Sequence, residues 1–219
     1  MKLDMLVVGA GFAGIYQLYK AREAGMSVKV LEAGEGIGGT WFWNRYPGAR
    51  CDVESLDYSY SFSRELEEEW EWSERYASQA EILRYMNHVV DRFELRDGIE
   101  LNARVTAAHY DEDHSLWHVR TADGRHHEAT WLVMATGGLS VPQKPSLKGL
   151  DEFKGPWYHS ARWPTEGVDF TGQRVVMIGT GSSGVQMTPE IAAQARQLTV
   201  LQRTANFSVP AHNVPFTPE

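Results

Sequence analysis

The sequence contains very little cysteine, with Cys51 as the one thiol among 219 residues. A single cysteine excludes a disulfide within the chain and a redox-active cysteine pair, which a disulfide reductase would need. The chain also lacks an apolar run near the roughly 20 residues that span a bilayer, so no membrane partner is expected. A first strand begins almost at Met1, which leaves no room for a signal peptide, and the expected location is cytoplasmic.

Positive charge is scarce as well. The chain has 21 Lys and Arg against 29 Asp and Glu, a net charge of −8. Phosphate backbones are bound by concentrated Lys and Arg, so no nucleic-acid partner is expected. Several histidines fall in residues 103–134 without the spacing of a metal motif, and no metal site is predicted there; they are His109, His114, His118, His126 and His127.

The chain does contain a strand–turn–helix–strand unit near its start. An apolar strand over residues 4–8 runs into the turn GAGFAG, a helix continues to about Ala24, and a strand over residues 27–31 ends on Glu32. In such a turn the first glycine permits a tight bend, the second admits a pyrophosphate, and the third lets the helix pack on the strand. The helix N-terminus adds N–H donors and a positive dipole end. The candidate ligand-binding residues of this turn are Gly9, Gly11, Phe12 and Gly14.

A second unit of the same kind follows. Its strand covers residues 174–178, its helix runs to about Arg196, and its next strand covers residues 198–201. The turn reads GTGSSG, and its candidate residues are Gly179, Thr180, Gly181, Ser182, Ser183 and Gly184. The fold is therefore predicted to be α/β, with two Rossmann-like dinucleotide-binding units of which the second is incomplete.

The residue after each second strand distinguishes the two ligands. Glu32 can accept hydrogen bonds from ribose hydroxyls and would repel a 2′-phosphate, which suits FAD or NAD. Arg203, followed by Thr204, can bind the 2′-phosphate of NADP through paired charge-assisted bonds. The economical interpretation is FAD in the first unit and NADPH in the second.

Between the two units, local patterns predict three further segments. Residues 79–94 form an amphipathic helix opened by a capping box from Ser78 to Glu81, and residues 103–134 form a β-meander. Residues 138–164 hold four prolines and predict an ordered crossover. The expected domains are a FAD-binding domain over residues 1–140, a linker over residues 141–170 and the start of an NADP-binding domain over residues 171–219.

The linker carries the most specific pattern, FKGPWYHSARWP. Its spacing, F-x-G-x-x-x-H-x-x-x-W-P, resembles the signature of Baeyer–Villiger monooxygenases, flavin enzymes that insert oxygen next to a ketone. The similarity extends through GGTWFWNRYPGARCD (residues 38–52), WSERYASQAEILRY, ATGGLSVPQ and LQRTANFSVPAHNVP, so that it covers essentially the whole chain. Within that family the chain is most similar to the phenylacetone monooxygenase-like branch.

The resemblance implies FAD and NADPH as cofactors, a ketone and O2 as substrates, and an ester or lactone as product. It implies that Asp52 lies beside the flavin and orients a catalytic arginine, and that Arg50 and Cys51 approach the nicotinamide. His159 is expected to couple the linker to movement of the NADP module, and Trp163 with Pro164 to anchor the crossover. It implies further FAD contacts from Glu32, Thr40, Trp41 and Tyr58, and a backbone contact from Val105 on the adenine side. The glycine pair that ends with Gly39 permits close backbone approach, so that Thr40, Trp41, Phe42 and Trp43 can lie along a flavin.

Relatives of this kind continue beyond the position of Glu219, so the chain is expected to be an N-terminal portion, with the catalytic arginine and most of the substrate pocket further along. Two alternatives stay open: an N-hydroxylating or flavin-containing monooxygenase, and an inactive nucleotide-binding fragment. The sequence leaves the particular ketone and the oligomeric state undetermined.

Overall fold

The computed structural model describes residues 2–217, which form two compact units. One unit combines the residues up to Phe42 with Leu83–Val141, and the other combines Trp43–Ile82 with the residues from Pro142 onward. The domain boundaries expected near residues 140 and 170 stay a prediction. None of the helices within residues 2–217 has both the length and the apolar character needed to cross a bilayer.

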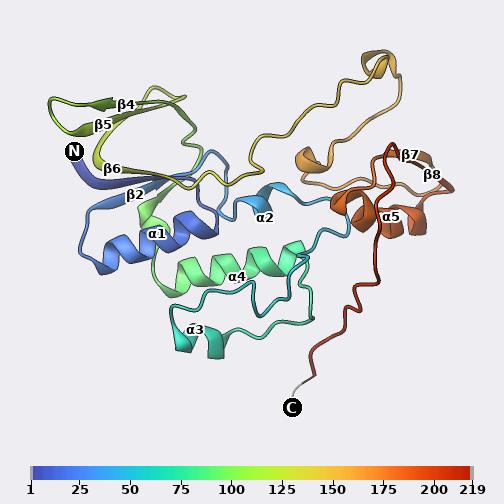
Figure 1. Ribbon diagram of the computed structural model, residues 1–219, viewed down its shortest axis with the longest axis horizontal. Coiled ribbons are helices and arrows are strands. Elements are labelled where there is room, and N and C mark those ends of the chain that lie inside the picture. Colours follow the sequence, from blue (N-terminus) through green and yellow to red (C-terminus); the bar gives the residue numbers. More distant parts are fainter. Residues whose placement is uncertain (1, 218–219) are drawn as a thin grey trace. The chain divides into compact units, whose positions relative to one another are not determined.

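A six-stranded sheet forms the first unit (Figure 1). The strand order is β3-β2-β1-β6-β5-β4, in which β3, β2, β1 and β6 are parallel while β5 and β4 are antiparallel to their neighbours. The strands are β1 Lys2–Val8, β2 Val28–Leu31, β3 Ile99–Glu100, β4 Val105–Asp111, β5 Leu116–Thr121 and β6 His126–Met134. Because Val8 is in register with both Leu31 and Met134, three parallel strands end at one edge of the sheet.

Helix α1 (Phe12–Glu23) connects β1 to β2 and lies on one face of the sheet (Figure 1). Its buried side chains, Ile15 and Leu18, pack inward at helical spacing. Gly25 adopts φ +73°, and the helix ends there because a residue with a side chain rarely adopts this conformation. The helix, the two parallel strands and the meander β4–β5–β6 confirm the α/β class predicted from the sequence.

Helix α4 (Gln79–Arg92) confirms the predicted amphipathic segment, with Ile82, Met86 and Val89 fully buried. The predicted capping box is only half formed. The hydroxyl of Ser78 accepts a hydrogen bond from the N–H of Glu81 at 3.4 Å, but the Glu81 carboxylate accepts from the N–H and hydroxyl of Ser73 instead. Two short helices, α2 (Thr40–Trp43) and α3 (Arg64–Glu69), precede α4.

The second unit contains one strand–helix–strand repeat: β7 (Arg174–Ile178), α5 (Ser182–Gln194) and β8 (Gln197–Leu201). The two strands are parallel and pair Ile178 with Leu201. A core cluster packs beneath them, and the half-buried Trp163 of the linker contacts this cluster, as expected of an anchor residue. The cluster consists of Tyr46, Ala49, Phe170, Met177, Met187 and Ile191.

Replacing Leu18 with alanine tests the packing of α1. The side chain is 0% exposed, so Leu18→Ala should lower the free energy of unfolding by about 2–5 kcal/mol through lost burial and the cavity left behind. The same change at Leu139, which is 79% exposed, is the matched control and should have little effect. Chemical denaturation measures both, and equal losses would contradict this packing.

Candidate functional site

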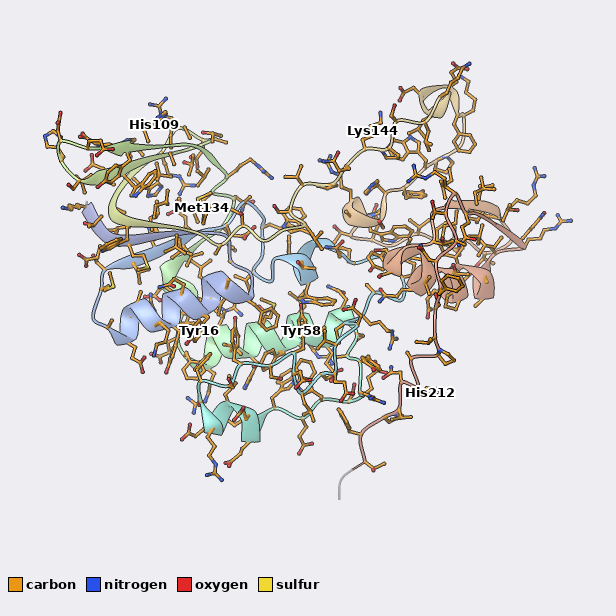
Figure 2. All side chains as sticks on the ribbon, viewed as in Figure 1. Tyr16, Tyr58, His109, Met134, Lys144 and His212 are labelled. Carbon is orange, nitrogen blue, oxygen red and sulfur yellow. The ribbon has the colours of Figure 1, made fainter. Side chains whose placement is uncertain are left out.

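The turn after β1 has no room for side chains at its first and last glycines. Gly9 adopts φ +104°, and a Cβ placed there would lie 2.5 Å from the carbonyl oxygen of Ala135. A Cβ on Gly14 would overlap the carbonyl oxygen of Gly9. Ala135 directly follows Met134, which lies at the end of β6 (Figure 2). The turn is therefore fixed between its own helix and the end of β6.

A second glycine pair brings another loop onto this turn. Gly39 adopts φ +54°, and a Cβ there would lie 2.9 Å from the Cα of Gly11. The N–H of Gly38 donates to the carbonyl of Ala10 at 2.9 Å. The sequence predicts close backbone approach at Gly39 by a cofactor, and the structure shows that the backbone of Gly11 already occupies one side.

The start of α1 suits an anion. Gly11 caps the helix with extended backbone and no side-chain hydrogen bond, and the first turn contains no acidic residue. Backbone N–H groups and the positive end of the helix dipole attract a phosphate at such a position. Phe12 opens the helix, and its ring centroid lies 6.3 Å from that of Tyr85.

Glu32 holds the same turn from the adjacent strand. It is 5% exposed, and its carboxylate accepts hydrogen bonds from the N–H groups of Ala10 and Gly34, each at 2.8 Å. Each carboxylate oxygen retains a further lone pair, so a ribose hydroxyl can still donate to it. A second anion is disfavoured here because the buried carboxylate would repel it.

The segment before β4 lies beside Glu32. The N–H of Ala103 donates to the backbone carbonyl of Glu32 at 2.7 Å, and Val105 begins β4 two residues later. The structure thus brings Glu32 next to the segment that leads into β4, which begins with the predicted FAD contact Val105.

The turn after β7 repeats the geometry of the first. Gly179 adopts φ +108°, and a Cβ on Gly184 would overlap the Gly179 carbonyl oxygen. The N–H of Gly179 donates to the carbonyl of Leu201 at 2.9 Å, just as that of Gly9 donates to the carbonyl of Leu31 at 2.8 Å. Gly181 caps α5 without a side-chain hydrogen bond, and Ser182 and Ser183 open the helix with no acid in its first turn.

The predicted phosphate-binding residues follow β8. Arg203 and Thr204 are both exposed, and within residues 2–217 no ion pair holds the Arg203 guanidinium. Thr180 in the turn is fixed by Gln202, whose amide donates to its hydroxyl at 2.9 Å, and by Asn206, whose amide donates to its carbonyl at 2.6 Å. The basic side chain therefore stands beside an ordered turn.

The residues expected to lie along a flavin form the short helix α2. Trp41 is 7% exposed and contributes to the protein core, whereas Thr40 and Trp43 are exposed and Phe42 is half-buried. The side chain of Phe42 packs over Gly36, where a Cβ would lie 2.5 Å from the ring. Helix α2 thus offers both packed and accessible aromatic surface.

Helix α5 holds the segment that leads to Asp52. The Gln186 side chain donates to the backbone carbonyl of Arg50 at 3.1 Å and accepts from the Tyr46 hydroxyl at 2.9 Å. Sequence reasoning missed Gln186 and Tyr46, because no local pattern indicates a contact between residues 140 apart. Asp52 and Tyr58 follow, the first exposed and the second half-buried.

Arg50 and Cys51 are held in place by neighbouring backbone and acid groups. The Arg50 guanidinium lies 3.4 Å from the Glu74 carboxylate and 3.3 Å from the Tyr76 carbonyl. Cys51 is buried, and burial raises the pKa of its thiol above the ordinary value, with hydrogen bonding to Ala77 opposing that shift. Cys51 is therefore a poor nucleophile in this unit.

His159 uses both of its ring nitrogens within the linker. Its Nδ1 accepts from the N–H of Ala161 at 3.2 Å, and its Nε2 lies 3.1 Å from the carbonyl of Gln143. A carbonyl can only accept and an N–H can only donate, so the two contacts together select the tautomer that carries its proton on Nε2. The ring ties together two parts of the linker 16 residues apart, which favours a positioning role over proton transfer.

A family model described as pyridine nucleotide-disulphide oxidoreductase matches residues 6–215. Among curated proteins, 2-oxo-Δ3-4,5,5-trimethylcyclopentenylacetyl-CoA monooxygenase of Pseudomonas putida is 48% identical over 99% of this chain and 41% of its own length. A protein named Baeyer-Villiger monooxygenase from Pseudooceanicola batsensis is 46% identical over 97% of the chain and 39% of its own length. Phenazine N-monooxygenase PhzNO1 of Lysobacter antibioticus is also 46% identical, over 95% and 38%.

Solved structures are equally similar. An oxidized steroid monooxygenase bound to NADP has a TM-score of 0.96 and 57% identity over all of this chain and 42% of its own length. The OTEMO complex with FAD and NADP has a TM-score of 0.93 and 49% identity over 98% and 41%. The chain thus spans about two fifths of the length of the proteins that it matches, and the resemblance noted in the sequence is confirmed.

The two hydrogen bonds that Glu32 accepts should contribute to the free energy of unfolding. A glutamine amide offers one acceptor oxygen, and its NH2 group would face an N–H donor, so Glu32→Gln should cost about 1–3 kcal/mol of unfolding free energy without any ligand. Glu35→Gln, at an exposed position in the same loop, is the control. Denaturant unfolding that is unchanged in Glu32→Gln would show that the two bonds contribute nothing.

The raised pKa of Cys51 makes a kinetic prediction. A raised pKa leaves less thiolate at any given pH, so native Cys51 should react with Ellman's reagent more slowly than the unfolded chain, and the rate should climb with pH beyond the ordinary thiol range. The one cysteine makes the assay unambiguous. Equal rates before and after unfolding would mean that the thiol is accessible.

Proposed function

The chain belongs to the pyridine nucleotide-disulphide oxidoreductase family, and on that premise we propose that it supplies the FAD site and part of the NADPH site of a Baeyer–Villiger monooxygenase. In this reaction one atom of O2 is inserted between the carbonyl carbon of a ketone and its neighbour, which gives an ester or lactone. The other atom leaves as water, and NADPH supplies the two electrons.

The observation that carries the proposal is the similarity to monooxygenases of this kind, at 46–48% identity over nearly the whole chain. The family description also covers disulfide chemistry, but Cys51 stands alone and is buried, so no cysteine pair supports that activity here. The linker pattern from Phe153 to Pro164 lies in the second unit and precedes its strand–helix–strand repeat along the chain.

The residues of the first unit fit FAD. The glycines of the turn present backbone without side chains to a pyrophosphate, the first turn of α1 supplies N–H groups, and Glu32 has acceptor capacity left for a ribose hydroxyl. When bound, FAD supplies hydride acceptance and O2 activation. The chain's own tasks are to bind and orient it, with Thr40, Trp41, Tyr58 and Val105 as further contacts in our proposal.

The second unit fits the phosphate end of NADPH. The turn over residues 179–184 would hold the pyrophosphate, and Arg203 with Thr204 would bind the 2′-phosphate. Gln186 of α5 binds the backbone carbonyl of Arg50, and Cys51 and Asp52 follow directly in the chain. A change in the position of α5 would therefore move all three residues. We propose that Asp52 orients a cationic group near the flavin, and that His159 positions the linker during turnover.

A second function from the same chemistry is N-oxygenation. A relative named phenazine N-monooxygenase is as similar to this chain as the one named Baeyer-Villiger monooxygenase, at 46% identity each. Both reactions need reduced flavin and O2, and they differ in whether a carbonyl carbon or a ring nitrogen receives the oxygen. The residues described here serve the cofactors and are common to both.

The decisive experiment supplies the whole protein with NADPH, labelled O2 and either cyclohexanone, phenylacetone or phenazine. We expect lactone from cyclohexanone and ester from phenylacetone, each carrying one labelled oxygen. Phenazine N-oxide without ester or lactone would favour the second function, and NADPH consumption that yields only peroxide would overturn both.

The chain alone can also be tested for cofactor binding. Titration with FAD should give a stoichiometric yellow complex that NADPH bleaches under anaerobic conditions. Absence of binding would favour the alternative that this segment is an inactive nucleotide-binding fragment. The cytoplasmic location and the absence of nucleic-acid and membrane partners stay predictions.

Arg203 makes the cofactor preference testable. Removing charge-assisted bonds to a 2′-phosphate costs about 1.5–3 kcal/mol, so Arg203→Ala should weaken NADPH binding about 10–100-fold and leave NADH binding nearly unchanged. Arg196→Ala, at an exposed position just after α5, is the control for lost positive charge. Equal weakening of NADPH and NADH by Arg203→Ala would contradict a 2′-phosphate role.

A further inference from the structure

We propose that the β-meander of the first unit carries a binding site for a divalent transition-metal ion such as Zn2+, formed by His118, His126 and Glu128. One ligand atom from each of these side chains lies within 4.8 Å of the others. The spacing of these residues in the sequence matches no short metal-binding motif, so no metal site is predicted here from the sequence. Strand pairing brings them together.

The register of β5 and β6 places all three side chains on one face. His118 pairs directly with Glu128, and the neighbouring pair on the same face is Arg120 with His126. Residues two apart on a strand share a face, so both strands present ligands to the same side. Val119 and Ala129, which alternate with them, are fully buried in the core on the opposite face. The core therefore fixes the direction in which the three side chains point.

The rings and the carboxylate lie in a suitable arrangement. The His118 and His126 rings are stacked, with centroids 5.4 Å apart and an interplanar angle of 22°. The Nδ1 of His118 lies 3.4 Å from a carboxylate oxygen of Glu128. Two imidazoles and one carboxylate form a donor set that suits Zn2+, and a fourth position would be left for water.

Asp111 contacts the ring nitrogen of His118 that does not face Glu128. This nitrogen, Nε2, lies 3.6 Å from the Asp111 carboxylate. Metal-binding histidines usually donate their second N–H to such a group, which fixes the tautomer and the ring orientation. Asp111 is thus a positioning residue: it would hold Nε2–H and leave Nδ1 directed to the metal.

The surrounding charges are mixed. Asp111 also contacts His114, whose Nδ1 lies 2.9 Å from the carboxylate, so two histidines share this acid. His109 on β4 is in register with His118 and lies on the meander (Figure 2). Arg120 shares the face and opposes a cation, whereas Glu128 and Asp111 favour one.

The test is titration of the metal-free protein with Co2+, whose visible absorption reports the ligand set, followed by displacement with Zn2+. We expect one ion per chain. His126→Ala and Glu128→Gln should each lower the affinity at least about tenfold, and Asp111→Ala about tenfold through loss of the positioning bond. His212→Ala, an exposed histidine in the second unit, is the matched control and should leave binding unchanged.

Thermal unfolding gives an independent readout, because a ligand that binds the folded chain raises its melting temperature. Excess Zn2+ should raise the melting temperature of the wild-type protein and of His212→Ala, but not that of His126→Ala. Absence of saturable Co2+ binding in the wild type, or equal binding by wild type and His126→Ala, would overturn the proposal. Far-ultraviolet circular dichroism shows whether each variant remains folded.

Discussion

The buried carboxylate of Glu32 is the interaction on which the first unit depends most. A buried charge is costly unless hydrogen bonds satisfy it, and here two backbone N–H groups do so, one from the glycine turn and one from the loop after β2. This pair of bonds ties the end of β2 to the turn that follows β1. The close approach of Gly39 to Gly11 and the Gly38–Ala10 bond lie in the loop so fixed. Ligand recognition and chain architecture thus share one side chain.

Much of the fold could be predicted because it is encoded in short-range patterns. The apolar run over residues 174–178 matches β7 at both ends, and the periodicity that predicts α4 agrees with its buried side chains. The predicted capping box forms only in part, because the Glu81 carboxylate accepts hydrogen bonds from the N–H and hydroxyl of Ser73, a residue outside the four-residue pattern. The two-residue strand β3 is too short to give any periodic signal.

The candidate site likewise contains residues that local sequence predicts and residues that it does not. The glycine turns, Glu32 and Arg203 follow from local sequence, since each stands at a strand end. The Tyr46–Gln186 bond and the grouping of His118, His126 and Glu128 depend on tertiary contacts and strand register, which a single sequence does not contain. Roles such as that of Asp52 rest on resemblance to a family rather than on a contact within this chain.

The two hydrogen bonds of His159 have a mechanical consequence. By joining Gln143 to Ala161 through one aromatic ring, they close the intervening segment into a loop whose ends are held together, and closure removes conformational freedom from every residue inside it. The exposed aromatic residues around Trp157 therefore lie in a closed loop rather than in a free segment. Trp163, which follows the C-terminal end of this loop, packs against the core of the second unit. A displacement of that core would therefore move the whole loop.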